Sequence, residues 1–191
     1  MTIARYVTVP NALSASRIVF LPLLWALALL RLKMPFTIAY ALVGITDLFD
    51  GLAARLLHQR SAFGKTLDSF ADLLYYLSSA FFLAWLYMDY LRPNLVLLYI
   101  LFGLLGLSFL VSAIRCGKPI MMHTFMLKLN AGLVYVGIIL SAFFDTTVLV
   151  TVVLAVYYVS YAEEILIFLV HGEVDPDSPT IFKVRPKPKR A

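Results

Sequence analysis

Charged residues are scarce in this sequence: Asp, Glu, Lys and Arg together make up 14% of the 191 residues. Hydrophobic residues make up 62%, and the mean hydropathy is +0.89. So few polar groups cannot cover the surface of a water-soluble domain of this length. The composition therefore excludes an ordinary soluble protein and predicts that lipid covers much of the outside of the molecule.

Cysteine is nearly absent as well, since Cys116 is the only one. A single cysteine excludes an internal disulfide and a cysteine-based metal cluster. We interpret Cys116 as a small apolar residue near the end of a helix. The N-terminal stretch has no obvious small-residue cleavage site, and its long apolar run is followed by five more, so we expect no signal peptide.

Apolar runs close to the bilayer-crossing length of about 20 residues recur along the chain. They lie at roughly 14–31, 36–58, 66–89, 95–115, 125–144 and 147–170. Pro35, Arg92–Asn94 and Asp145 are among the breaks between them. The pattern predicts an all-α fold, an integral membrane bundle of six transmembrane helices over residues 1–172. A basic, proline-rich cytoplasmic tail is expected over residues 173–191.

The Lys and Arg residues predict an orientation for this bundle, because positively charged loops stay in the cytoplasm. With six spans, the two most basic loops and both ends of the chain fall on one side. That side is expected to be the cytoplasmic face of an inner or plasma membrane. A short amphipathic helix before Asn11 is expected to lie along the interface. The net charge of +5 favours anionic lipid headgroups and phosphate substrates as partners, rather than nucleic acid.

Only 11 residues are acidic, yet four of them fall in the stretch DLFDGLAARLLHQRSAFGKTLDSFAD. These four are Asp47, Asp50, Asp68 and Asp72. Carboxylates inside a membrane segment are costly and are retained where they bind something. The spacing places two of them on one face of the second segment and two on one face of the third. Two adjacent antiparallel helices can direct all four into one pocket near the cytoplasmic end.

Charge neutrality predicts what this pocket binds. Four negative charges in a low dielectric need compensation, and two divalent cations supply it. Oxygen-only ligands favour hard ions such as Mg²⁺ or Mn²⁺. Gly51, Ala54 and Gly64 leave room for a substrate, and Arg55 can clamp a phosphate. The pattern indicates a metal-dependent enzyme acting on a phosphate compound, with polar contacts between helices as the alternative role of the aspartates.

This spacing resembles the signature of the CDP-alcohol phosphotransferases. In this sequence it reads Asp47-x-x-Asp50-Gly51-x-x-Ala54-Arg55, eight residues, Gly64, three residues, Asp68, three residues, Asp72. The resemblance implies transfer of a substituted phosphoryl group from a CDP-linked lipid or alcohol to an alcohol hydroxyl, with release of CMP. It implies that the four aspartates hold two Mg²⁺ or Mn²⁺ ions and that Asp72 is also the general base.

The same resemblance implies roles for the small residues of the signature. Gly51 and Ala54 would let the cytidine nucleotide pack closely, with Gly64 giving room on the third segment. Arg55 would bind the donor diphosphate. Family members are usually homodimers, so a homodimer is expected here too.

The acceptor alcohol must be read from other residues. The start of the chain resembles the phosphatidylglycerol-phosphate and cardiolipin synthase branches, through Pro10, Asn11, Ser14, Arg17 and Pro22. CDP-diacylglycerol is therefore the favoured donor and glycerol 3-phosphate the favoured acceptor. Inositol phosphate, phosphatidylglycerol or another alcohol are the alternatives. Four basic residues are candidate ligands of an anionic acceptor: Arg115, Lys128, His123 and Arg17.

Several of these assignments have alternatives. Arg17 either reaches a phosphate or extends to lipid headgroups. His123 belongs either to a helix start or to the site, and Asn11 is a candidate cap of the first helix. Glu163 and Glu164 lie in a stretch that resembles short bacterial family members. One of them either pairs with a basic residue or adds a carboxylate to the site.

Two other functional classes also accommodate six spans and four aspartates. One is a divalent-cation transporter, and the other is a non-catalytic membrane scaffold. The segment from Gly51 to Arg55 favours the enzyme, because a transporter has no use for a phosphate-clamping arginine beside close-packing small residues.

Overall fold

The computed structural model describes residues 8–57, 59, 61–122, 124–176 and 178–185. It describes only the backbone of residues 48, 51, 52, 54, 55, 62 and 65. All regular structure within these ranges is helical, which confirms the predicted fold class. The expected interfacial helix falls largely on residues 1–7, outside the described ranges.

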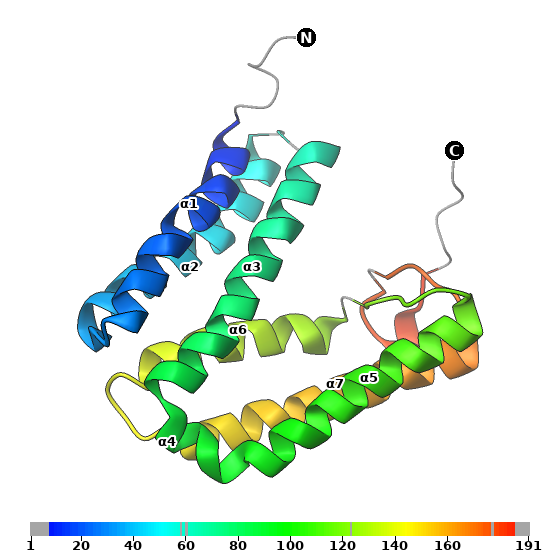
Figure 1. Ribbon diagram of the computed structural model, residues 1–191. Helices are drawn as coiled ribbons and strands as arrows, with labels where there is room; N and C mark the ends of the chain where they lie inside the picture. Colours follow the sequence, from blue (N-terminus) through cyan, green and yellow to red (C-terminus); the bar gives the residue numbers. More distant parts are fainter. Residues whose placement is uncertain (1–7, 58, 60, 123, 177, 186–191) are drawn as a thin grey trace. The chain divides into compact units, whose positions relative to one another are not determined.

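The chain forms two compact units (Figure 1). The first comprises Met1–Met88 and Tyr135–Phe144. Its helices are α1 (Val9–Leu29), α2 (Lys33–Leu56), α3 (Ala62–Leu86) and the last part of α6 (Phe125–Leu140). Within this unit, α1 packs against both α2 and α3.

The second unit comprises Asp89–Val134 and Asp145–Ala191. Its main helices are α5 (Leu95–Cys116) and α7 (Thr147–His171), which lie side by side (Figure 1). The short helices are α4 (Met88–Leu91), which starts at the unit boundary, and the 3₁₀ turns Arg92–Asn94 and Ile181–Lys183. The first part of α6 also belongs to this unit.

Local capping explains where several helices begin and end. Thr8, not Asn11, caps α1, since its side chain accepts the backbone N–H of Asn11 at 3.4 Å. The first helix therefore begins five residues earlier than expected and draws Asn11 inside. Asp145 accepts both the hydroxyl and the backbone N–H of Thr147, which holds the pKa of this carboxyl below its usual value. Gly117 ends α5 in the left-handed conformation that glycine tolerates best.

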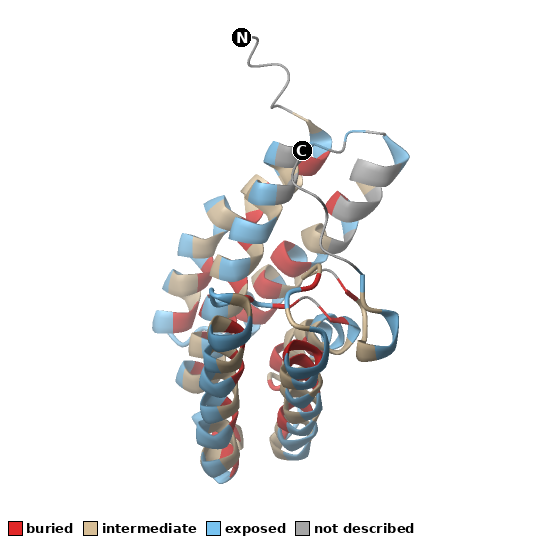
Figure 2. Ribbon diagram, turned by 90° about the vertical axis from the view of Figure 1, so that its right-hand side faces the viewer, coloured by how far each residue is buried: buried red, intermediate tan, exposed pale blue. Residues whose placement is uncertain are grey.

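Four helical stretches in the described part of the chain have the length and apolar composition needed to cross a bilayer. They are Val9–Leu29, Thr66–Leu86, Met88–Cys116 and Thr147–His171. α6 is apolar but shorter, with 16 residues. Exposed residues run along much of each helix, and many of them are large and apolar (Figure 2). These features describe an integral membrane protein, while six crossings stay a prediction.

The segment after α7 folds back on the second unit. Val174 joins a hydrophobic core with Ile120, Met122, Ile167 and Phe168. Glu163 accepts the backbone N–H of Ile181 at 3.0 Å, and buried Glu164 accepts that of Met122 at 3.1 Å. Both glutamates thus hold backbone amides of other segments.

Aromatic packing links α2 and α3 in the first unit. The rings of Tyr40 and Tyr75 stack with centroids 5.0 Å apart, and Tyr75 donates its hydroxyl to the carbonyl of Tyr40 at 3.0 Å. Tyr135 of α6 donates to the carbonyl of Ala41 at 2.7 Å. Gly44 permits this approach, because a Cβ there would lie 2.6 Å from the Tyr75 hydroxyl and would overlap the ring of Tyr135.

Gly44→Ala is expected to destabilise the protein, although alanine is normally the better helix former. The added methyl group would force apart three packed elements, at a cost of about 1–3 kcal/mol. Thermal unfolding in detergent measures the effect. Gly103→Ala is the control, since nothing lies within 4 Å of a Cβ at that helical position. Equal midpoints for the two variants would contradict this account of Gly44.

Candidate active site

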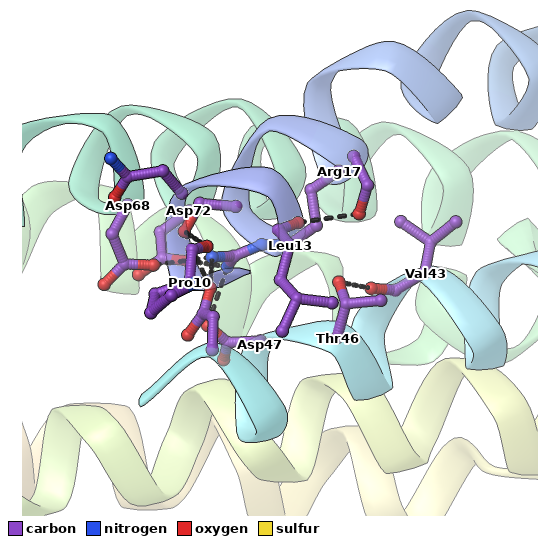
Figure 3. A network of polar contacts seen from close by, with 12 residues as sticks. Pro10, Leu13, Arg17, Val43, Thr46, Asp47, Asp68 and Asp72 are labelled. Atoms are coloured by element: carbon purple, nitrogen blue, oxygen red, sulfur yellow. Dashed lines mark hydrogen bonds and ion pairs between the residues drawn. The ribbon is translucent and has the colours of Figure 1, made fainter. Parts of the chain in front are cut away.

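One guanidinium lies among the four aspartates of the sequence pattern, which we call the aspartate cluster. Arg17 of α1 is 1% exposed. Its Nη1 donates to Asp47 Oδ1 at 2.6 Å and also to Asp72 Oδ1. Its Nη2 donates to Asp50 Oδ2 and to Asp68 Oδ1, at 2.5 Å each. Figure 3 shows Asp47, Asp68 and Asp72 turned towards this group, so the predicted convergence of the carboxylates is confirmed.

The cluster has a closed side and an open side. Asp50 is the closed end, with a side chain only 5% exposed. The side chains of Asp47, Asp68 and Asp72 are 36%, 40% and 34% exposed. A solute can therefore reach three of the four carboxylates from outside the helix group.

The donor set of the cluster fits a hard divalent cation. Carboxylate oxygens of Asp47, Asp50 and Asp68 lie within 4.8 Å of one another. Oxygen ligands of this kind suit Mg²⁺ or Mn²⁺. When all five groups are ionised, one guanidinium against four carboxylates leaves a strongly negative site. The cluster can thus attract further positive charge.

α1 forms a third wall of the site, which was not predicted from the sequence. Its buried polar residues Asn11, Ser14 and Arg17 recur every three positions. The Ser14 hydroxyl lies 2.9 Å from Asp50 Oδ2, to which it donates. Gly64 of α3 has a packing role here, because a Cβ would lie 2.6 Å from Asn11 Oδ1. The sequence feature that could have revealed this wall is the polar residue at every third position of an otherwise apolar helix.

The remaining predicted site residues are not part of the aspartate cluster. Gly51, Ala54 and Arg55 continue α2 after Asp50, but their side chains lie outside the described part. His123 also falls outside it. Arg115 and Lys128 are exposed in the second unit, and Arg115 donates to the carbonyl of Leu169 at 2.5 Å. Their binding roles stay predictions.

A model of the CDP-alcohol phosphatidyltransferase family matches residues 7–162. The chain belongs to this family. The matched range includes the aspartate cluster, Arg17 and the whole family signature. The transferase resemblance drawn from the aspartate spacing is thereby confirmed at the level of the family.

Two kinds of CDP-alcohol phosphatidyltransferase are among its relatives. The chain is 38% identical over 100 residues to the cardiolipin synthase (CMP-forming) of Streptomyces coelicolor, covering 49% of this chain and 46% of that protein. It is 46% identical over 69 residues to the human cardiolipin synthase (CMP-forming), covering 34% and 22%. The matches thus span less than half of these two relatives.

Similarity also extends to a protein whose name contains glycerol 3-phosphate. The CDP-diacylglycerol–glycerol-3-phosphate 3-phosphatidyltransferase of Aquifex aeolicus is 28% identical over 137 residues. This match covers 69% of the chain and 76% of that protein. No solved structure matches the chain.

Ser14→Ala is expected to destabilise the protein by about 1–2 kcal/mol, because it removes a buried hydrogen bond to a carboxylate. Thermal unfolding in detergent measures the loss. Ser16→Ala is a matched control in the same helix, since the Ser16 hydroxyl donates to the carbonyl of Leu13 within α1. If Ser16→Ala destabilises as much as Ser14→Ala, the contact with Asp50 does not contribute as argued.

Proposed function

We propose that this chain is a membrane phospholipid synthase that transfers a phosphatidyl group from CDP-diacylglycerol to glycerol 3-phosphate and releases CMP. The observation that carries the proposal is the convergence of the four signature carboxylates on one partly exposed site. Membership of the CDP-alcohol phosphatidyltransferase family supplies the donor class. The named reaction of the Aquifex aeolicus relative supports the acceptor.

The proposed reaction joins the acceptor hydroxyl oxygen to the phosphorus that bears the diacylglycerol. The bond from this phosphorus to the bridging oxygen breaks, and that oxygen leaves with CMP. Asp72 takes the hydroxyl proton, since its carboxylate is on the open side of the cluster. Two Mg²⁺ or Mn²⁺ ions held by the aspartate cluster would neutralise the diphosphate and stabilise the charge on CMP.

The other signature residues would position the donor. Arg55 follows Asp50 by five positions on α2, so the same helix can offer a guanidinium to the diphosphate. Gly51 and Ala54 would give the cytidine nucleotide room along α2. Gly64 would do so on α3, in addition to its contact with Asn11.

The acceptor assignment rests on basic residues of the second unit. Arg115, Lys128 and His123 would bind the phosphate of an anionic alcohol. Both terminal nitrogens of Arg17 donate to the aspartate cluster, so we assign this residue to the cluster before the acceptor. Phosphatidylglycerol is the second candidate acceptor, because two relatives are named cardiolipin synthase. Inositol phosphate or another alcohol would use the same chemistry.

We also infer the arrangement in the membrane. The six expected spans correspond to the long helices α1, α2, α3, α5, α6 and α7 in the described residues. Six crossings would place the aspartate cluster at the cytoplasmic face, where CDP-activated lipids and water-soluble acceptors meet. A homodimer is the proposed assembly.

Asp72→Asn is expected to abolish CMP release, because an amide cannot accept the hydroxyl proton. Purified protein would receive CDP-diacylglycerol, Mn²⁺ and each alcohol of a panel in turn: glycerol 3-phosphate, phosphatidylglycerol and inositol phosphate. We expect a loss of at least about 100-fold. Asp89→Asn, at an exposed position of α4, should retain full activity. The proposal fails if no alcohol yields CMP or if Asp72→Asn works as well as the parent.

Arg115→Gln and Lys128→Gln are each expected to raise the KM for glycerol 3-phosphate about ten-fold, through loss of a charge-assisted contact. The KM for CDP-diacylglycerol should change little. Arg92→Gln is the control, since this exposed arginine lies between the third and fourth expected spans. Unchanged acceptor KM values would remove these two residues from the acceptor site.

A further inference from the structure

Arg17 is an unusual cation, because all four hydrogens on its terminal nitrogens go to carboxylates. Nη1 donates to Asp47 and Asp72, and Nη2 donates to Asp50 and Asp68. We propose that Arg17 is a built-in counter-cation that competes with divalent metal ions for the aspartate cluster. The inference rests on the proposed function, in which the cluster holds those ions.

The burial of Arg17 shows that it serves the cluster and not the lipid surface. The residue is 1% exposed, so its side chain does not extend to headgroups. Its fifth donor, Nε–H, has no hydrogen-bond partner among the described residues. A buried guanidinium left partly unsatisfied is costly. The ion pairs with the aspartates are what compensate for that burial.

Arg17 and a divalent cation need the same place. An ion held jointly by Asp47, Asp50 and Asp68 would lie among oxygens within 4.8 Å of one another. The guanidinium already bonds one oxygen of each of these residues, at 2.5 to 2.6 Å. Two cations this close repel strongly in a low dielectric. Binding of metal must therefore weaken or displace the contacts of Arg17.

The competition has a structural consequence for the helices. Through Arg17, α1 is bonded to two carboxylates of α2 and two of α3. The arginine thus neutralises part of the site's charge and holds three helices together without metal. On this proposal its presence lowers the affinity for metal, and the three helices stay linked when no metal is bound.

Metal affinity tests the competition directly. The full chain in detergent would be treated with a chelator, dialysed and titrated with Mn²⁺, with free Mn²⁺ measured by electron paramagnetic resonance. We expect Arg17→Gln to bind Mn²⁺ about ten-fold more tightly than the parent, because a repelling charge is gone. Arg17→Lys should bind about three-fold more tightly, since an ammonium has fewer donors and cannot bridge four carboxylates.

Arg31→Gln is the matched control, with the parent's Mn²⁺ affinity expected. It removes the same charge from the first unit, but Arg31 is exposed and lies over the ring of Trp85. Arg31 lies fourteen positions after Arg17, about 21 Å along a continuous helix, so its Coulomb interaction with the cluster is several-fold weaker than that of a contacting guanidinium.

Stability supplies a second readout that does not depend on activity. In chelator, Arg17→Gln is expected to unfold at least about 5 °C below the parent, because the carboxylates lose their buried partner. Saturating Mn²⁺ should restore most of this loss. Arg31→Gln should unfold at the same temperature as the parent, both in chelator and in saturating Mn²⁺.

Equal or weaker Mn²⁺ binding by Arg17→Gln overturns the competition. If that variant does not fold, equal or weaker binding by Arg17→Lys overturns it instead. Release of CMP by the parent alongside such a result leaves the proposed function standing. A parent that neither binds Mn²⁺ nor releases CMP refutes the proposed function, and the inference with it.

Discussion

Charge compensation in a low dielectric is the constraint on which the first unit depends. Four carboxylates meet between apolar helices, where an uncompensated charge is far more costly than in water. Arg17 compensates part of this charge from within the chain, and its contacts join α1 to both α2 and α3. The contacts of the aspartate cluster therefore also link the helices of this unit, so site and fold are stabilised by the same contacts.

The aromatic packing next to the cluster supports its geometry. Gly44 lies one helical turn before Asp47 on α2, and Tyr75 lies one turn after Asp72 on α3. The stacking of Tyr40 on Tyr75, which Gly44 leaves room for, fixes the separation of the two helices there. A rigid layer one turn away limits how far the carboxylates can separate, as a preorganised site requires.

The sequence predicts the helices and the carboxylate convergence well, because hydropathy and helical spacing act within a single segment. It did not predict the place of α1. From the sequence, Asn11 was a candidate helix cap, and Arg17 was a candidate contact of a phosphate or of lipid headgroups. Only the packing of α1 against α2 and α3 decides between such roles. The same reason applies to Glu164, whose partner, the backbone of Met122, lies on another segment.

In the proposed function, the reaction and the choice of acceptor depend on different residues of the chain. A relative named cardiolipin synthase (CMP-forming) and a relative whose name contains glycerol 3-phosphate both match this chain. In the proposed function, the aspartate cluster acts on the diphosphate of the donor, which is the same for every candidate acceptor. It follows that the cluster cannot distinguish the acceptors. That distinction must come from groups that recognise the acceptor itself, and a phosphate-bearing alcohol needs cationic donors that the carboxylate-rich cluster, with its one arginine engaged, does not offer.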